Sequence, residues 1–159
     1  MSEKGKRPIG DEEIFAEMKR LLDGGSEVIF TPKGLSMLPF IRGGKDSVAL
    51  HKVPPGEIQV GDVVLAEIPP KRNKVMHRVF KREGDELTLM GDGNIRGTES
   101  CSVNDVMGKV TDVLPCKDPS RRRPLGKGKL WKALLPFRRY ILAIYRRLPW
   151  IHISGYTVQ

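Results

Sequence analysis

The chain has 159 residues, of which 39% are hydrophobic and 30% are charged, and its formal net charge is +9. This composition is typical of a single globular domain with an appendage and argues against disorder throughout. The positive charge belongs to one end: residues 1–116 contain 17 basic and 18 acidic residues, whereas residues 117–159 contain 11 basic residues and 1 acidic residue. Nucleic acid, anionic lipid or an acidic protein could each bind such a segment, so charge alone selects none of them.

The cysteines and the N-terminal residues indicate the compartment. Cys101 and Cys116 are the only cysteines, and their spacing fits neither a zinc site nor a disulfide framework, so we expect no metal, no cofactor and a reducing environment. Residues 1–11 are polar, and no window has the roughly 20 apolar residues that a membrane span needs. We therefore expect a cytoplasmic protein without an N-terminal anchor, which could still bind the inner face of the membrane as a peripheral protein.

The first expected element is a short helix within an N-terminal segment, residues 1–26. Apolar side chains recur at helical spacing over residues 11–22, the first turn is acidic, and Gly24 and Gly25 follow. The pattern predicts an amphipathic helix that packs on the rest of the domain.

Residues 27–116 show the pattern of a β-rich domain. Turn signals rich in glycine, proline and asparagine separate short apolar runs, and no helical period lies between them. We predict strands at 28–31, 47–53, 62–68, 75–81, 86–90 and 106–114. The fold class expected from these strands is mostly β, as a barrel or a sandwich.

The basic end of the chain divides into a linker, residues 117–129, and an amphipathic tail, residues 130–159. Pro136 should split the helical pattern of the tail into two short helices or kink one helix. The tail could pack on its own domain, adsorb to an anionic membrane, or bind a partner; nucleic acid ranks below lipid because no nucleic-acid-binding signature is present. The residues singled out for membrane or anion contact are Trp131, Lys132, Arg138, Arg139, Arg146 and Arg147.

Three short motifs contain residues that could act together in catalysis. Ser36 lies in a turn bounded by Gly34 and Pro39, and taken alone it is an ordinary turn residue. His77 lies in an alternating strand pattern, where a histidine is usually structural, although imidazole is also well suited to take a proton near neutral pH. Asp92 lies in a tight turn that, taken alone, simply connects two strands.

Taken in order along the chain, five motifs resemble those of the signal peptidase I superfamily, which also contains the LexA-type self-cleaving repressors. The motifs are Gly-x-Ser-Met-x-Pro at 34–39, Gly-Asp-Val-Val at 61–64, His-Arg-Val at 77–79, Gly-Asp-x-Asn at 91–94 and Gly-Lys-Val at 108–110. The match covers about residues 28–113. It implies a mostly β catalytic domain of the signal-peptidase and LexA barrel type, in which a serine attacks the carbonyl of a peptide bond.

The third motif indicates a particular branch of this superfamily. Bacterial signal peptidases and LexA-type repressors have a lysine before the arginine of this motif, whereas this chain has His77 there and Lys74 lies outside the matching position. The chain therefore resembles the serine-histidine branch found in archaea, in the endoplasmic reticulum and in some spore-forming bacteria. The resemblance implies that Ser36 Oγ is the nucleophile and that His77 is the general base.

The acidic partner of the histidine stays open. Asp92 matches the Gly-Asp element and is the first choice, whereas Glu99 is the second choice because the histidine branch often takes its acid a few positions later. A dyad of Ser36 and His77 without an acid is the third alternative.

The resemblance also implies where the developing oxyanion binds. The Ser36 backbone N–H is the expected donor, in a substrate site shaped by Gly34, Met37 and Pro39. The family commonly has Ser-Gly before the nucleophile, and the earlier serine can assist the oxyanion hole, but this chain has Gly34 and Leu35. Loss of one such donor slows related reactions roughly 100-fold or more.

The function implied is that of a serine endopeptidase that cleaves a protein or peptide precursor. Since no anchor is expected, an intracellular substrate fits better than an exported preprotein. The first alternative is a catalytically inactive domain of the same fold that binds a peptide strand. The second is a self-cleaving LexA-type regulator, which ranks lowest because residues 1–26 are too few for a DNA-binding domain and no Ala-Gly or Cys-Gly cleavage pair precedes residue 27.

Overall fold

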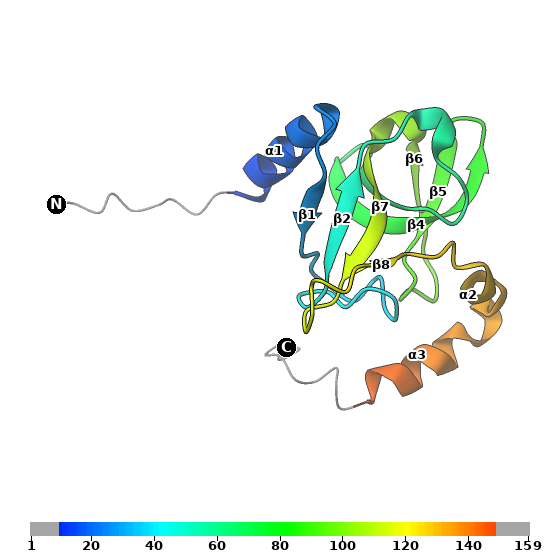
Figure 1. Cartoon of the computed structure of the whole chain (residues 1–159). Helices are drawn as coiled ribbons and strands as arrows, with labels where there is room; N and C mark the ends of the chain where they lie inside the picture. Colours follow the sequence, from blue (N-terminus) through cyan, green and yellow to red (C-terminus); the bar gives the residue numbers. More distant parts are fainter. Residues whose placement is uncertain (1–9, 149–159) are drawn as a thin grey trace.

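An antiparallel sheet of eight strands forms most of the protein and curls into a half-barrel (Figure 1). The computed structural model describes residues 10–148. The strands are β1 (Val28–Phe30), β2 (Ser47–His51), β3 (Val63–Ile68), β4 (Asn73–Glu83), β5 (Glu86–Met90), β6 (Glu99–Ser102), β7 (Val106–Leu114) and β8 (Arg123–Pro124). This architecture confirms the prediction of a mostly β fold.

The order of the strands across the sheet is β1-β2-β7-β3-β4-β5-β6, and β8 pairs with β7. The long central strand β7 pairs with β2 over residues 109–114, with β3 over residues 106–109, and with β8 at Asp112 and Val113. β3 lies between β7 and β4, and both of its faces are covered over its first four residues: Val63 and Leu65 pack into the main core cluster, whereas Val64 and Ala66 pack into a second cluster.

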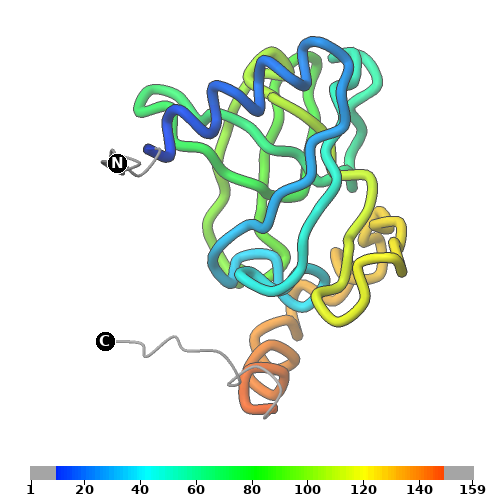
Figure 2. Tube along the Cα trace, turned by 60° about the vertical axis from the view of Figure 1, so that its left-hand side comes forward, coloured from blue at the N-terminus to red at the C-terminus, as the bar shows by residue number. Residues whose placement is uncertain are grey.

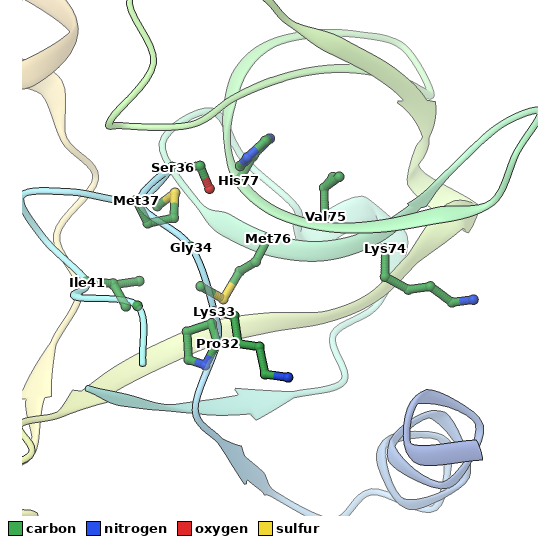
Figure 3. A pocket seen from close by; sticks show the side chains of 11 residues that line it. Pro32, Lys33, Gly34, Ser36, Met37, Ile41, Lys74, Val75, Met76 and His77 are labelled. Atoms are coloured by element: carbon green, nitrogen blue, oxygen red, sulfur yellow. The ribbon is translucent and has the colours of Figure 1, made fainter. Parts of the chain in front are cut away.

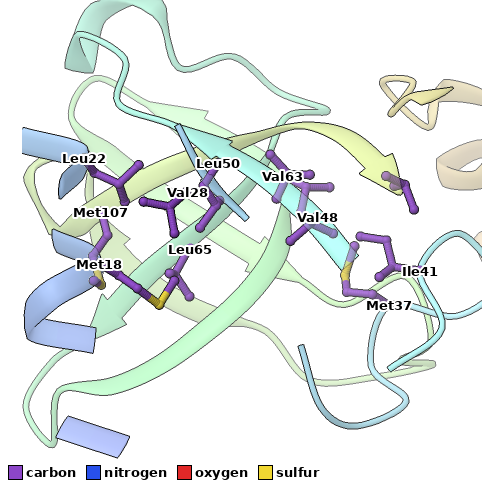
Figure 4. Packing of buried hydrophobic residues seen from close by; sticks show 12 residues of the cluster. Met18, Leu22, Val28, Met37, Ile41, Val48, Leu50, Val63, Leu65 and Met107 are labelled. Atoms are coloured by element: carbon purple, nitrogen blue, oxygen red, sulfur yellow. The ribbon is translucent and has the colours of Figure 1, made fainter. Parts of the chain in front are cut away.

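The N-terminal helix α1 (Asp11–Asp23) covers one end of the half-barrel, as the sequence predicts. Met18 and Leu22 are its buried residues, and Leu22 packs where Gly108 of β7 leaves room, since a Cβ at Gly108 would lie 3.2 Å from the Leu22 side chain. Figure 4 shows that the same core cluster extends from these two side chains to Met37 and Ile41 in the loop between β1 and β2. A continuous core therefore links α1 to the turn that contains Ser36.

The basic segment forms α2 (Lys129–Ala133), a 3₁₀ turn (Leu135–Phe137) and α3 (Arg138–Arg146). Pro136 lies in the 3₁₀ turn, so the prediction that it divides the segment is confirmed. Figures 1 and 2 show α3 at the end of the half-barrel opposite α1, next to the loop between β1 and β2. Among residues 10–148, no helix is long and apolar enough to cross a bilayer.

Residues 117–129, expected as a linker, are attached to the domain at several points. Arg123 and Pro124 form β8, Lys127 contacts the carboxylate of Asp62, and Leu125 packs against the main core. These contacts fix where α2 begins.

Two of the six residues predicted to contact a membrane or an anion have a different role. Trp131 is 7% exposed and Arg138 is 3% exposed, because both side chains lie where the tail packs on the half-barrel. Their prediction as surface contacts is therefore wrong. Lys132, Arg139, Arg146 and Arg147 are exposed.

Candidate active site

Ser36 lies in a compact turn that is followed by two buried side chains, Met37 and Leu38. The Leu38 N–H donates to the Leu35 carbonyl at 3.2 Å, and the Phe40 N–H donates to the Met37 carbonyl at 3.1 Å. Met37 packs into the main core, whereas Leu38 packs into a second cluster with residues of the tail. Ser36 itself is half-buried, and the two buried side chains that follow it anchor the turn.

Ser36 and His77 line the same pocket, which has a volume of about 170 Å³. Figure 3 shows the two side chains next to each other at one end of it. No hydrogen bond within residues 10–148 joins them, as is common before a substrate tightens the catalytic contacts. The sequence-predicted nucleophile and base are therefore brought together from segments that are 41 positions apart.

Glu99 is the carboxylate that holds His77. Its Oε2 lies 2.8 Å from His77 Nδ1, and His77 is 6% exposed. Since a carboxylate accepts hydrogen bonds, Nδ1 is the donor to it, and in the neutral imidazole Nε2 is then the acceptor nitrogen. This is the tautomer that a general base needs in order to accept a proton from a serine hydroxyl.

Asp92, the first choice for the acid, does not contact His77. Its carboxylate accepts hydrogen bonds from Arg78 Nε at 2.9 and 3.1 Å and from Arg78 Nη2 at 2.7 Å, and the pair is buried. Successive side chains of a strand point to opposite faces, so His77 and Arg78 of β4 reach different carboxylates. The structure therefore places Glu99 beside His77 and Asp92 in a separate ion pair.

The loop that contains Asp92 supports the Ser36 turn through its glycines. The Gly93 N–H donates to the Ser36 carbonyl at 2.7 Å. A Cβ at Gly93 would overlap the Leu35 carbonyl oxygen, and a Cβ at Gly91 would overlap the Ser36 carbonyl oxygen. Gly91 and Gly93 thus support the Ser36 turn, a role that the sequence did not assign to them, although their Gly-x-Gly spacing was a signal that two backbones could approach closely.

The expected oxyanion donor is available in this structure. Within residues 10–148, no acceptor is bonded to the Ser36 N–H, so the group is free to donate to a substrate oxygen. Gly34 and Met37 line the pocket, whereas Pro39 follows Leu38 through a cis peptide bond and lies outside the lining. The structure thus places two of the three shaping residues at the pocket.

Lys74, the lysine nearest to His77 along the chain, also lines the pocket but contacts residues of α1. Its Nζ lies 3.1 Å from Glu12 Oε1 of α1 and 5.9 Å from the centre of the Phe15 ring. Figure 3 shows its side chain directed away from Ser36. These contacts direct Lys74 toward α1, whereas His77 lies beside Ser36.

An open strand edge runs along the pocket. β4 pairs with β3 over residues 73–78 and with β5 over residues 78–83, and no described strand pairs with its second edge over residues 73–77. The lining also includes Pro32, Lys33 and Gly34, and the apolar side chains of Met37 and Met76. An extended peptide could pair with this edge beside the pocket.

The tail closes the other side of the Asp92 loop. Trp131 Nε1 donates to the Asp92 carbonyl at 2.9 Å, Arg138 Nη1 donates to the Asn94 carbonyl at 3.2 Å, and Arg146 Nη2 donates to the Gly93 carbonyl at 3.1 Å. Burial lowers the pKa of Arg138 from its ordinary value; the charge of Asp92 opposes this shift and the charge of Arg78 adds to it. The tail is therefore part of the support of the candidate site.

Cys101 provides no alternative nucleophile near Glu99. Burial, together with the negative charges of Asp105 and Glu99, raises the pKa of its thiol to about 11. Because the thiolate is the reactive form, this cysteine is inert near neutral pH.

Comparison with known proteins assigns no family or function to the chain. No protein-family model matches the chain, and no curated protein matches it significantly. Any functional conclusion therefore depends on the ordered motifs and on the geometry that connects Ser36, His77 and Glu99.

Proposed function

We propose that this protein is a serine endopeptidase of the signal peptidase and LexA type, with Ser36, His77 and Glu99 as its triad. The observation that carries the proposal is the 2.8 Å contact between Glu99 and His77, in the pocket that also contains Ser36. A base oriented by a carboxylate beside a serine is the arrangement that activates a hydroxyl. The curled mostly β sheet is compatible with this fold type.

The proposed reaction begins when Ser36 Oγ attacks the carbonyl carbon of the scissile peptide bond. His77 Nε2 takes the hydroxyl proton, and the Ser36 N–H donates to the oxyanion that forms. His77 then gives this proton to the leaving amine as the C–N bond breaks, which leaves an acyl ester on Ser36. A water molecule, deprotonated by the same nitrogen, hydrolyses the ester and restores the serine.

The proposed substrate is a peptide segment in an extended conformation. It would add a strand to the open edge of β4 at residues 73–77, so main-chain hydrogen bonds supply much of the affinity. Met37, Ile41 and Met76 in the lining favour an apolar side chain next to the cleaved bond. We infer a protein or peptide precursor as the substrate class.

Labelling with a serine-directed phosphonate tests the proposal. Wild-type protein should gain the mass of one phosphonyl group, and Ser36→Ala should gain none. Ser100→Ala is the matched control, because Ser100 is exposed on β6 outside the pocket, and it should label like wild type. His77→Ala should label at least about 100-fold more slowly. His51→Ala, whose imidazole contacts Glu27 at the surface, should label like wild type.

Other outcomes would support a different function. The open edge of β4 suits a non-catalytic peptide-binding domain equally well, and absence of an adduct in wild-type protein would favour that domain over the peptidase. Two fragments that appear on incubation at raised pH, but not in Ser36→Ala, would identify a self-cleaving regulator.

A further inference from the structure

One face of α3, continued by Phe137 of the preceding 3₁₀ turn, exposes large apolar side chains. Phe137, Tyr140 and Ile144 are 60%, 55% and 65% exposed. They recur at positions i, i+3 and i+7, so they share one face of the helical segment. The opposite face packs on the half-barrel through Arg138 and Leu142. We refer to Phe137, Tyr140 and Ile144 as the α3 apolar stripe.

Basic side chains border this stripe. Arg147 follows Ile144 by three positions and is exposed, and Arg139 is exposed with its guanidinium 4.4 Å from the centre of the Tyr140 ring. Next to them, Arg96, Arg139 and Arg146 line an open surface pocket between the Asp92 loop and α3. Residues 119–148 contain ten basic residues and no acidic residue.

We infer that this face of α3 docks on the surface of an anionic lipid bilayer. The α3 apolar stripe would enter the boundary between headgroups and acyl chains, and Arg139, Arg147 and Arg96 would contact lipid phosphates. Aromatic and aliphatic side chains on one helical face, bordered by arginines, are the composition of helices that lie in this boundary. The inference goes beyond the proposed peptidase function and does not depend on it.

The composition of the face favours lipid over the other occupants. Nucleic acid would use the arginines, but it would leave Ile144 and the edge of Phe137 in water because phosphates offer no apolar contact. A second copy of the chain carries the same net charge of +9 and the same arginines, so like charges would meet at the interface. An anionic bilayer offers acyl chains to the α3 apolar stripe and phosphates to the bordering arginines.

Docking in this way would bring the candidate site close to the lipid. Leu142, on the inner face of α3, packs against Leu38 two residues after Ser36. Arg146 bonds to the carbonyl of Gly93, whose N–H bonds to Ser36. Figures 1 and 2 show α3 beside the end of the half-barrel that carries this turn.

Co-sedimentation of the full chain with lipid vesicles tests the inference. The protein should pellet with vesicles that contain phosphatidylglycerol and should stay in solution with pure phosphatidylcholine, and added salt should weaken the binding. Phe137→Ser, Tyr140→Ser and Ile144→Ser together should abolish pelleting. Arg139→Gln and Arg147→Gln should each reduce the partition constant about fivefold.

Matched variants on other faces distinguish docking through α3 from nonspecific binding to vesicles. Ile14→Ser with Val60→Ser removes exposed apolar side chains elsewhere, and Lys71→Gln with Lys81→Gln removes two exposed charges elsewhere. Both pairs should bind vesicles like wild type, and all variants should keep the wild-type circular dichroism spectrum. The inference is overturned if wild type ignores anionic vesicles, if the α3 variants bind unchanged, or if the matched pairs lose binding equally. Self-association or binding to duplex DNA without vesicle binding would overturn it as well.

Discussion

At the scale of single residues, the site depends on which carboxylate each neighbour on β4 reaches. His77 and Arg78 point to opposite faces of the strand, and their partners are Glu99 and Asp92. The sequence ranked Asp92 first and Glu99 second, whereas the structure pairs Glu99 with His77, because a motif match says nothing about the face that a side chain shares. Strand pairing brings Glu99 to His77. Leu89 of β5 lies opposite Val79 of β4 on one side and opposite Glu99 of β6 on the other. His77 is two residues before Val79 and therefore shares the face of the sheet on which Glu99 lies.

Glu99→Gln is the residue-scale test of the triad. The amide should weaken the orientation of the imidazole and the stabilisation of its charged form, so phosphonate labelling of Ser36 should slow roughly 100-fold or more. The free energy of unfolding should change by less than about 1 kcal/mol, since the Glu99 side chain is 30% exposed. Labelling kinetics and urea unfolding measure the two effects, and an unchanged labelling rate would leave a Ser36 and His77 dyad.

Asp92→Asn should show the reverse pattern. Arg78 and the buried Arg138 would lose the charge that opposes theirs, so the free energy of unfolding should fall by about 3 kcal/mol. The labelling rate of the folded protein should fall less than in Glu99→Gln, because the Asp92 carboxylate does not contact His77. A larger kinetic effect in Asp92→Asn would return Asp92 to the role of the acid.

At the scale of secondary-structure elements, the Ser36 turn is held between two apolar clusters. Met37 packs into the cluster that reaches α1, and Leu38 packs into the cluster formed with Trp131 and Leu142 of the tail. The Gly91 to Asn94 loop then bonds to the carbonyl of Ser36. A turn with this support keeps its serine in one position, which a nucleophile requires.

Gly93→Ala tests the contact between the loop and the turn. The added methyl group would overlap the Leu35 carbonyl, so one backbone must move, and the free energy of unfolding should fall by about 1–3 kcal/mol. Labelling of Ser36 should slow because the turn moves. Gly56→Ala is the control, since no atom lies within 4 Å of its added methyl group, and equal effects of the two variants would contradict the proposed support.

Leu142→Ala tests whether the tail stabilises the domain. Leu142 is fully buried against Leu38 and Trp131, so its truncation should lower the free energy of unfolding by about 2–5 kcal/mol in urea titrations. Ile144→Ala, two positions away on the exposed face, should change it by less than about 0.5 kcal/mol. If Leu142→Ala were equally neutral, the tail would not pack on the half-barrel in solution.

At the scale of the whole molecule, the buried carboxylate of Asp62 connects the basic segment to the sheet. Asp62 is buried and accepts a hydrogen bond from the Gln59 N–H at 2.9 Å, with Lys109 of β7 at 3.2 Å and Lys127 of the 117–129 segment also in contact. Burial by itself would raise the pKa of Asp62, but the contacts with Lys127, Gln59 and Lys109 outweigh it and lower the pKa. The charged carboxylate therefore stabilises the folded state.

This shift predicts how stability depends on pH. A group whose pKa is lower in the folded than in the unfolded state contributes its full stabilisation above its unfolded value, near 3.9 for aspartate, and loses it as the pH falls through the folded value. Asp62→Asn should therefore be less stable than wild type at pH ~7, and the difference should shrink below pH ~4. Urea unfolding at both pH values measures it, and an equal difference at both would contradict the role of the charge.

The sequence by itself determined the local elements whose patterns are strong. Apolar periodicity predicted α1, and β5 and β7 have the predicted bounds, because these segments bury side chains at regular spacing. The sequence missed β6, which contains Glu99, and the two-residue strand β8. Their residues are polar or few, so they become strands only because β5 and β7 offer backbone partners.

The tertiary structure alone decided how distant segments meet at the site. The order of the motifs predicted Ser36 and His77 as site residues, since a serine can act as a nucleophile and a histidine as a base. Only strand pairing placed Glu99 beside His77. Only packing revealed that Trp131 and Arg138 are buried and that Phe137, Tyr140 and Ile144 form the exposed face of the tail. The physical reason is that an amphipathic pattern shows two faces of a helix, and contact with the rest of the domain decides which of them meets water.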